Sequence, residues 1–89
     1  MQVRKVSAPV FTALPDGTGV LLNIETLLYF GLNRTGAAIW REIDQTGTAA
    51  LEDVVHSICE RFDVDPGSAK GQIGRYLEEL ARLRLVELI

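Results

Sequence analysis

The fold class follows from residues 27–40, which read LLYFGLNRTGAAIW. Up to Leu32 the apolar side chains suit an extended strand, in which successive side chains point to opposite faces. Beyond Asn33 the apolar residues follow the spacing of a helix, and either Asn33 or Thr35 can cap its N-terminus. These apolar residues are Ala37, Ile39, Trp40 and Ile43. The stretch therefore predicts a change from strands to helices, with the first helix ending before Gly47.

Two more strands are predicted upstream. Residues 10–14 and 19–23 are apolar runs, and residues 15–18, PDGT, lie between them. Proline presets φ and glycine accepts a positive φ, so these four residues predict a hairpin turn. Residues 24–26 join the second run to a third at residues 27–32, and such short connections predict a three-stranded antiparallel meander. On the third strand, one face would carry Leu28, Phe30 and Leu32 and the other would carry Leu27, Tyr29 and Gly31.

A second helix is predicted over residues 51–62. Its apolar residues recur at helical spacing, Thr48 is a candidate N-cap, and Glu52 and Asp53 suit the positive end of the helix dipole. The apolar residues are Leu51, Val54, Val55, Ile58, Cys59 and Phe62.

A third helix is predicted from Asp65, its N-cap, and Pro66, at the first helical position, to about residue 83. Its apolar residues are Ala69, Ile73, Tyr76, Leu77, Leu80 and Leu83. The interior glycines Gly71 and Gly74 each cost about 1 kcal/mol relative to alanine, so either close packing or an open groove beside the helix should compensate. Residues 85–89 suit a short extended segment.

Three strands followed by three helices and a short extended segment predict an α+β domain. The order of the elements is that of a winged helix-turn-helix, with a three-stranded antiparallel sheet preceding the helices. With 89 residues, the chain is expected to form a single domain over residues 1–89. This architecture alone does not indicate a function.

Composition narrows the functional classes. The chain is 47% apolar and carries a net charge of −3, which suits a packed domain and disfavours non-specific binding to nucleic-acid phosphates. Its one cysteine, Cys59, cannot form an internal disulfide, and its N-terminal residues lack the apolar core of a signal peptide. No apolar run approaches the roughly 20 residues needed to cross a bilayer. We therefore expect a cytoplasmic protein that has no membrane partner.

No motif in the sequence supports an enzyme. His56 has no nucleophile implied at a useful spacing, and Cys59 falls on an apolar stripe, where a cysteine behaves as a small hydrophobe. The carboxylates Glu60, Asp63 and Asp65 lack the rest of a calcium loop, and no phosphate-binding loop is present. We expect no catalytic residues, no metal site and no cofactor.

Charge is unevenly distributed along the chain. Residues 34–65 contain three arginines, Arg34, Arg41 and Arg61, against seven carboxylates, whereas residues 66–89 carry one excess positive charge. The third helix, which would be the DNA-reading helix of a winged helix-turn-helix, is therefore mildly basic. A DNA-binding regulator remains the alternative function, although the acidic preceding helix would lie close to the phosphates.

The order of several short motifs resembles the PqqD-like family, named for the pyrroloquinoline quinone synthesis protein D. Residues 32–40, LNRTGAAIW, resemble the family's passage from strand to helix. Residues 48–55 and Arg61-Phe62 resemble its second helix, and the apolar positions of the third helix resemble its third. The likeness covers roughly residues 11–88. Gln72 departs from the pattern, since many relatives have an acidic residue there.

This resemblance implies a non-enzymatic module that recognises a peptide. Members of the family bind the leader of a ribosomally made precursor peptide and present its core to tailoring enzymes. Residues 29–33 followed by Thr35-Gly36 look most like free-standing members from lasso peptide pathways, which implies a separate leader peptidase and possibly a cyclase as partners.

The implied site is the edge of the third strand beside the third helix. An extended leader can pair its main chain with such an edge, while side-chain pockets supply selectivity. Phe30 and Leu28 would line the pocket, Lys70 would meet a leader carboxylate, and Gly74 would leave room. The full set of expected peptide-binding residues is Leu27, Leu28, Tyr29, Phe30, Gly31, Lys70, Ile73, Gly74 and Leu77. Ordinary core packing is the competing interpretation for Phe30, Ile73 and Leu77, and a structural subunit that uses this edge for dimerisation is a third functional possibility.

Overall fold

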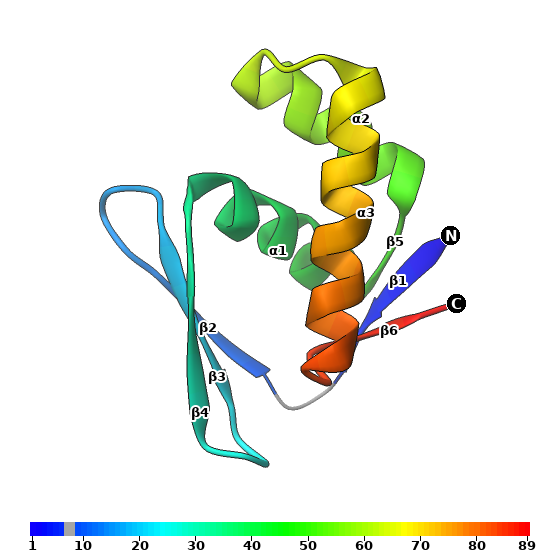
Figure 1. Ribbon diagram of the computed structural model, residues 1–89. Helices are drawn as coiled ribbons and strands as arrows, with labels where there is room; N and C mark the ends of the chain where they lie inside the picture. Colours follow the sequence, from blue (N-terminus) through cyan, green and yellow to red (C-terminus); the bar gives the residue numbers. More distant parts are fainter. Residues whose placement is uncertain (7–8) are drawn as a thin grey trace.

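The computed structural model describes residues 1–6 and 9–89 (Figure 1). Two small antiparallel sheets and three helices make up the molecule. In chain order the elements are β1 (Gln2–Lys5), β2 (Pro9–Ala13), β3 (Gly19–Asn23), β4 (Leu28–Leu32), α1 (Arg34–Thr46), β5 (Thr48–Ala50), α2 (Leu51–Phe62), α3 (Pro66–Arg82) and β6 (Val86–Leu88). The α+β class and the winged helix-turn-helix-like arrangement are confirmed.

The predicted meander forms the sheet β2-β3-β4. Leu21 of β3 lies opposite Phe11 of β2 and Phe30 of β4, so these three side chains share the face that turns toward the core. One boundary differs from the prediction. Leu27 lies in the turn before β4, with a φ of 59°, and its side chain is 71% exposed. The buried Asn23 holds this turn because its side chain accepts a hydrogen bond from the backbone N–H of Glu25 at 3.0 Å.

The second sheet, in the order β5-β1-β6, was not expected from the sequence. Val3 at its centre pairs with Ala49 on one side and Leu88 on the other. The extended segment predicted for residues 85–89 is confirmed as β6. The two ends of the chain thus lie side by side, as Figure 1 shows, and backbone hydrogen bonds join Gln2 and Ile89 in both directions.

The predicted helix caps are confirmed for two of the three helices. Asn33 accepts a hydrogen bond from the N–H of Gly36 at 2.8 Å, and Asp65 accepts one from Ser68 at 3.0 Å. The expected role of Thr48 was wrong. Thr48 belongs to β5, and the N-cap of α2 is Ala50, which has no side chain able to accept a hydrogen bond.

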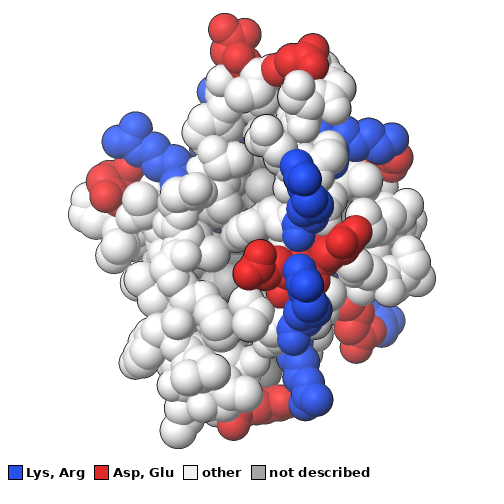
Figure 2. Space-filling view, in the orientation of Figure 1, with Lys and Arg blue, Asp and Glu red and all other residues white. Residues whose placement is uncertain are grey.

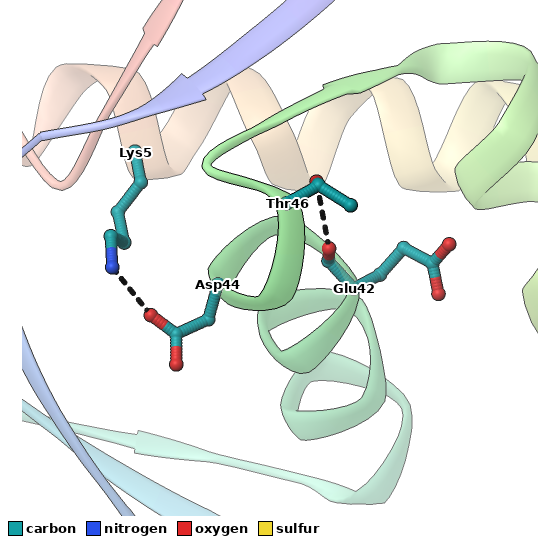
Figure 3. Close-up of polar contacts among 4 residues, drawn as sticks. All are labelled: Lys5, Glu42, Asp44 and Thr46. Carbon is teal, nitrogen blue, oxygen red and sulfur yellow. Dashed lines mark hydrogen bonds and ion pairs between the residues drawn. The ribbon is translucent and has the colours of Figure 1, made fainter.

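Polar contacts fix the end of α1 against the second sheet (Figure 3). Lys5 at the end of β1 donates a hydrogen bond through Nζ to Asp44 Oδ1 at 2.7 Å. The Thr46 hydroxyl donates to the backbone carbonyls of Glu42, at 3.2 Å, and Thr48, at 2.6 Å. Gly47 between them takes a φ of 75°, which glycine adopts without strain. These contacts turn the chain sharply from α1 into β5.

The core lies where the three helices meet the inner faces of the two sheets. Trp40 of α1, Leu77 of α3 and Val3 of β1 are each fully buried. Phe11 and Phe30 of the meander are partly buried and pack against this core. Trp40 is therefore a core residue, and the meander packs on α1, which Figure 1 shows covering one face of it.

Candidate functional site: the edge of β4 and the cavity between the helices

Strand β4 has a free edge. It pairs with β3 on one side, and among the described residues no strand pairs with its other side. An edge strand exposes a row of backbone N–H and C=O groups that a second extended chain can join. Since β4 has five residues and a strand rises about 3.3 Å per residue, the edge offers roughly 16 Å for such pairing.

The two faces of β4 differ in what they offer. Leu28, Phe30 and Leu32 lie on the inner face, and their burial increases along the strand from Leu28, which is 55% exposed, to Leu32, which is 7% exposed. Tyr29 and Gly31 point to the outer face, where Tyr29 is 72% exposed. The inner face thus combines a buried end that belongs to the core with a half-open end at Leu28.

A cavity of about 410 Å³ lies between the first residues of α1, the end of α2 and the first half of α3. We call it the helix cavity. It is lined by Asn33, Thr35, Gly36, Ile39, Ile58, Phe62, Val64, Ser68, Ala69, Gln72, Ile73 and Tyr76. Because Asn33 directly follows β4, the helix cavity lies at the C-terminal end of that strand. Its lining is mostly apolar with a few hydroxyl and amide groups, which is typical of ligand sites.

Tyr76 supplies the most unusual polar group of the helix cavity. Its hydroxyl is buried and, within the described part of the chain, has no hydrogen-bond partner. Burial, assisted by the negative charge of Glu79, raises the pKa of Tyr76 to about 12. A Cβ added to Gly36 would lie 2.8 Å from Tyr76 Oη, so the absence of a side chain at Gly36 leaves the hydroxyl its place. The hydroxyl therefore stays protonated and can donate a hydrogen bond to a group that enters the cavity.

The expected residues of α3 lie in different surroundings from one another. Ile73 and Leu77 are 4% and 0% exposed, so they belong to the core, although Ile73 also lines the helix cavity. Lys70 Nζ lies 3.7 Å from Glu52 Oε1 and therefore faces α2. Gly74 is four residues beyond Lys70 and shares that flank of α3.

The opposite flank of α3 faces the helix cavity through Gln72 and Tyr76, which are again four residues apart. The sequence-based site contains neither residue. In the sequence, Tyr76 is part of the apolar repeat of α3, and Gln72 differs from the family pattern; neither observation predicts a place in the site. The spacing of four residues predicts that positions 72 and 76 share one flank of α3. Which flank faces the helix cavity depends on how the helices pack.

Charged side chains are concentrated on the outward side of α3 (Figure 2). The surface beside them, toward the β2-β3-β4 meander, is uncharged and hollowed in this view. A ligand in this hollow would contact apolar and backbone groups, with charges at its margin.

Residues 1–6 and 9–89 contain no group of three or more histidine, cysteine or acidic side chains placed to hold a metal ion. His56 is exposed and lies 2.9 Å from Glu60 on the next turn of α2, and Cys59 is partly buried against the core. In the same part of the chain, no helix is both long and apolar enough to span a bilayer.

Comparison with known proteins identifies the family. The family model described as coenzyme PQQ synthesis protein D (PqqD) matches residues 18–86. The chain belongs to the PqqD family. The match begins at the hairpin turn and ends in β6, so it spans the β3-β4 hairpin, all three helices and the start of the last strand. No curated protein matches this PqqD-family chain.

A solved structure extends the likeness beyond the family model. It is described as TbiB1 in complex with the TbiA(beta) leader peptide. The PqqD-family chain is 29% identical to it, with a TM-score of 0.86, and the alignment covers 97% of this chain and 96% of the other. The likeness therefore includes β1, β5 and β6, which form the second sheet.

Proposed function

We propose that this PqqD-family chain is a non-enzymatic protein that captures the leader of a ribosomally made precursor peptide and delivers it to a separate leader peptidase, and possibly a cyclase. The free edge of β4 beside the uncharged hollow carries the proposal. Full-length similarity to a protein described in complex with a leader peptide supports it. A lasso peptide pathway is the context suggested by the sequence motifs.

In the proposed complex the leader adds a strand to the free edge of β4. Main-chain hydrogen bonds would provide affinity for any extended peptide, and side-chain contacts would provide selectivity. Leu28 and Phe30 would contact leader side chains from the inner face of β4. At the other end of the strand, the helix cavity would receive an apolar leader side chain, and the Tyr76 hydroxyl would donate a hydrogen bond to a carbonyl oxygen of the leader.

The expected roles of the remaining residues are refined by their positions. Backbone groups of Tyr29 and Gly31 would take part in strand pairing, while their side-chain positions face away from the groove. On α3, we expect the leader to contact Gln72 and Tyr76 instead of Lys70 and Gly74. Gln72 and Tyr76 face the helix cavity, whereas Lys70 pairs with Glu52. Leu27 would contact only a leader long enough to reach the turn.

A matched pair of variants tests the proposal. Leu28 on the inner face of β4 and Val10 in β2 are 55% and 47% exposed, so aspartate at either position should leave the fold intact. The probe is a synthetic leader peptide, taken from a precursor gene next to the gene of this protein. We expect Leu28→Asp to weaken its binding roughly tenfold, because the new charge would be desolvated between β4 and the leader. Val10 lies opposite Leu22, whose partner on the other side is Tyr29, so Val10 belongs to the outer face and Val10→Asp should bind normally. Calorimetry that shows no binding to the unmodified protein, or equal losses in both variants, would contradict the proposal.

A further inference from the structure

A second cavity lies on the other flank of α1. It has a volume of about 340 Å³, and we call it the arginine pocket. It is lined by Pro15, Asp16, Gly17, Arg34, Ala38, Arg41, Arg61 and Phe62. Arg34, Ala38 and Arg41 follow one another along one stripe of α1, whereas Thr35, Gly36 and Ile39 face the helix cavity. Of the lining residues, the two cavities share Phe62.

The arginine pocket gathers positive charges from a part of the chain that is acidic overall. Residues 34–65 contain seven carboxylates and three cationic side chains, Arg34, Arg41 and Arg61. All three arginines line this one cavity. Among residues 1–6 and 9–89, the ion pairs involve Arg4, Lys5, His56 and Lys70, and none includes these arginines. The lining thus holds three positive charges against the single carboxylate of Asp16, and an anion in the pocket would reduce the remaining repulsion.

The arginines are held in place by groups other than carboxylates. Arg34 Nε donates a hydrogen bond to the backbone carbonyl of Asp16 at 2.8 Å. The guanidinium carbons of Arg41 and Arg61 lie 5.8 Å from the ring centroids of Phe11 and Phe62, respectively, within the range of a cation–π contact. Because these contacts restrict the side chains beforehand, a bound anion would lose less entropy in ordering them.

Asp16 is the one carboxylate in the lining, and its side chain forms hydrogen bonds within the hairpin turn. Its Oδ1 accepts hydrogen bonds from the backbone N–H of Thr18 at 3.0 Å and from the Thr18 hydroxyl at 2.5 Å. These bonds, with a smaller contribution from Arg34, lower the pKa of Asp16. Asp16 therefore offsets one positive charge of the pocket and leaves an excess.

We infer that the arginine pocket binds carboxylate side chains of an acidic segment on a partner protein, at a site separate from the leader-binding edge of β4. Arginine pairs with carboxylates through two parallel hydrogen bonds, and the apolar atoms of Pro15, Ala38 and Phe62 would exclude water from such pairs. A nucleic acid fits less well, because the cavity is small and the protein is acidic overall, whereas phosphate backbones need an extended basic surface. The partner would be a processing enzyme or another protein with clustered aspartate or glutamate.

The experiment uses an acetylated and amidated tetraglutamate peptide as the probe, with tetraglutamine as its neutral control. In nuclear magnetic resonance titrations, the side-chain N–H signals of Arg34, Arg41 and Arg61 should shift with tetraglutamate and stay in place with tetraglutamine. Unshifted arginine signals, or equal shifts with the neutral peptide, would overturn the inference. Equal binding of inorganic phosphate or of a short DNA duplex would overturn it as well, since either would indicate a general anion or nucleic-acid site.

Matched variants distinguish the pocket from overall charge. The double substitution Arg41→Gln and Arg61→Gln should lower tetraglutamate affinity roughly tenfold, because it removes two charge-assisted contacts. The control, Arg75→Gln with Arg82→Gln, removes the same net charge from exposed positions of α3 and should bind the probe normally. Equal weakening in both double variants would overturn the inference. Leader binding should be unchanged in the pocket variant, so failure of this inference and failure of leader capture are separate results.

Discussion

At the residue scale, Tyr76 connects the packing of the helices with the chemistry of the helix cavity. Its ring packs against the core while its hydroxyl reaches the first turn of α1, where Gly36 provides the space. The apolar spacing of α3 predicts that position 76 turns inward, but it does not predict what the hydroxyl meets. The surroundings of the hydroxyl depend on the contact between α1 and α3. The two residues that meet there, Gly36 and Tyr76, are 40 positions apart in the sequence.

The ionisation of Tyr76 provides a test of its burial. In a Tyr29→Phe variant, Tyr76 is the one tyrosine left, so phenolate absorbance reports it alone. We expect its pKa near 12 in the folded protein, against 10.0 for an unperturbed tyrosine, because burial disfavours the phenolate. Titration near pH 10 in the folded protein would contradict the burial of this hydroxyl.

The same pKa shift has a consequence for stability. Because the folded-state pKa of Tyr76 is raised above the unfolded value, the folded protein retains the phenolic proton while the unfolded chain loses it. The contribution to the free energy of unfolding is therefore full below pH 10 and declines toward pH 12. Denaturant unfolding at several pH values should show this decline, and a Tyr29→Phe, Tyr76→Phe double variant should show less of it.

At the element scale, local signals predicted the helices and the meander well. The Asn33 and Asp65 caps, the turn at residues 15–18 and the apolar spacing each depend on residues a few positions apart. Strands β1 and β5 were missed because they have four and three residues, too few to establish a period. Their pairing joins Gln2 to Ala50 and Val3 to Leu88, and no local pattern specifies such distant partners.

The candidate site was predicted in part for the same reason. The edge of β4 follows from chain order, since the third strand of a meander lies at the edge of its sheet. The flank of α3 that faces the helix cavity does not follow from chain order, because Lys70 and Gln72 are both polar and lie on either side of the apolar stripe. Only the packing of α3 on α2, visible in the pairing of Lys70 with Glu52, distinguishes them.

A pair of arginine substitutions tests which flank of α3 contacts the leader. Gln72 is exposed and lines the helix cavity, so Gln72→Arg should obstruct the cavity and weaken leader binding roughly tenfold, by the cost of an unpaired charge at an apolar site. A Cβ at Gly74 would meet no atom within 4 Å outside the neighbouring backbone of α3, and Gly74 lies on the Lys70 flank, so Gly74→Arg should bind the leader normally. It should also raise the free energy of unfolding by about 0.5–1 kcal/mol, because arginine favours a helix interior more than glycine does.

Calorimetric titration of both variants with the leader distinguishes the two flanks. If Gln72→Arg binds the leader normally and Gly74→Arg loses affinity for it, the leader contacts the Lys70 flank of α3 and the proposed flank is wrong. Unfolding by denaturant checks that neither substitution acts through the fold.

At the scale of the whole molecule, one sheet is proposed to bind the leader and the other to stabilise the fold. The β2-β3-β4 sheet supplies the free edge proposed for the leader, whereas β5-β1-β6 joins the chain termini to the ends of α1 and α3. Arg4 of β1 forms an ion pair with Glu87 of β6 on the exposed side of the second sheet, and Val3 packs into the core on the other side. The second sheet thus stabilises the helices that bound the helix cavity without contributing to the cavity lining.

Substitutions in β1 should therefore separate stability from binding. Val3 is fully buried at the centre of the second sheet, so Val3→Ala should lower the free energy of unfolding by about 1–3 kcal/mol through lost apolar contacts and a residual cavity. Arg4→Ala removes an exposed ion pair and should cost less than about 1 kcal/mol. Denaturant unfolding measures both changes. At a temperature where each variant is folded, calorimetry should give the leader affinity of the unmodified protein, because neither residue lies near β4 or the helix cavity. A loss of affinity in folded Val3→Ala would mean that the second sheet shapes the binding site, and the separation of tasks would then be wrong.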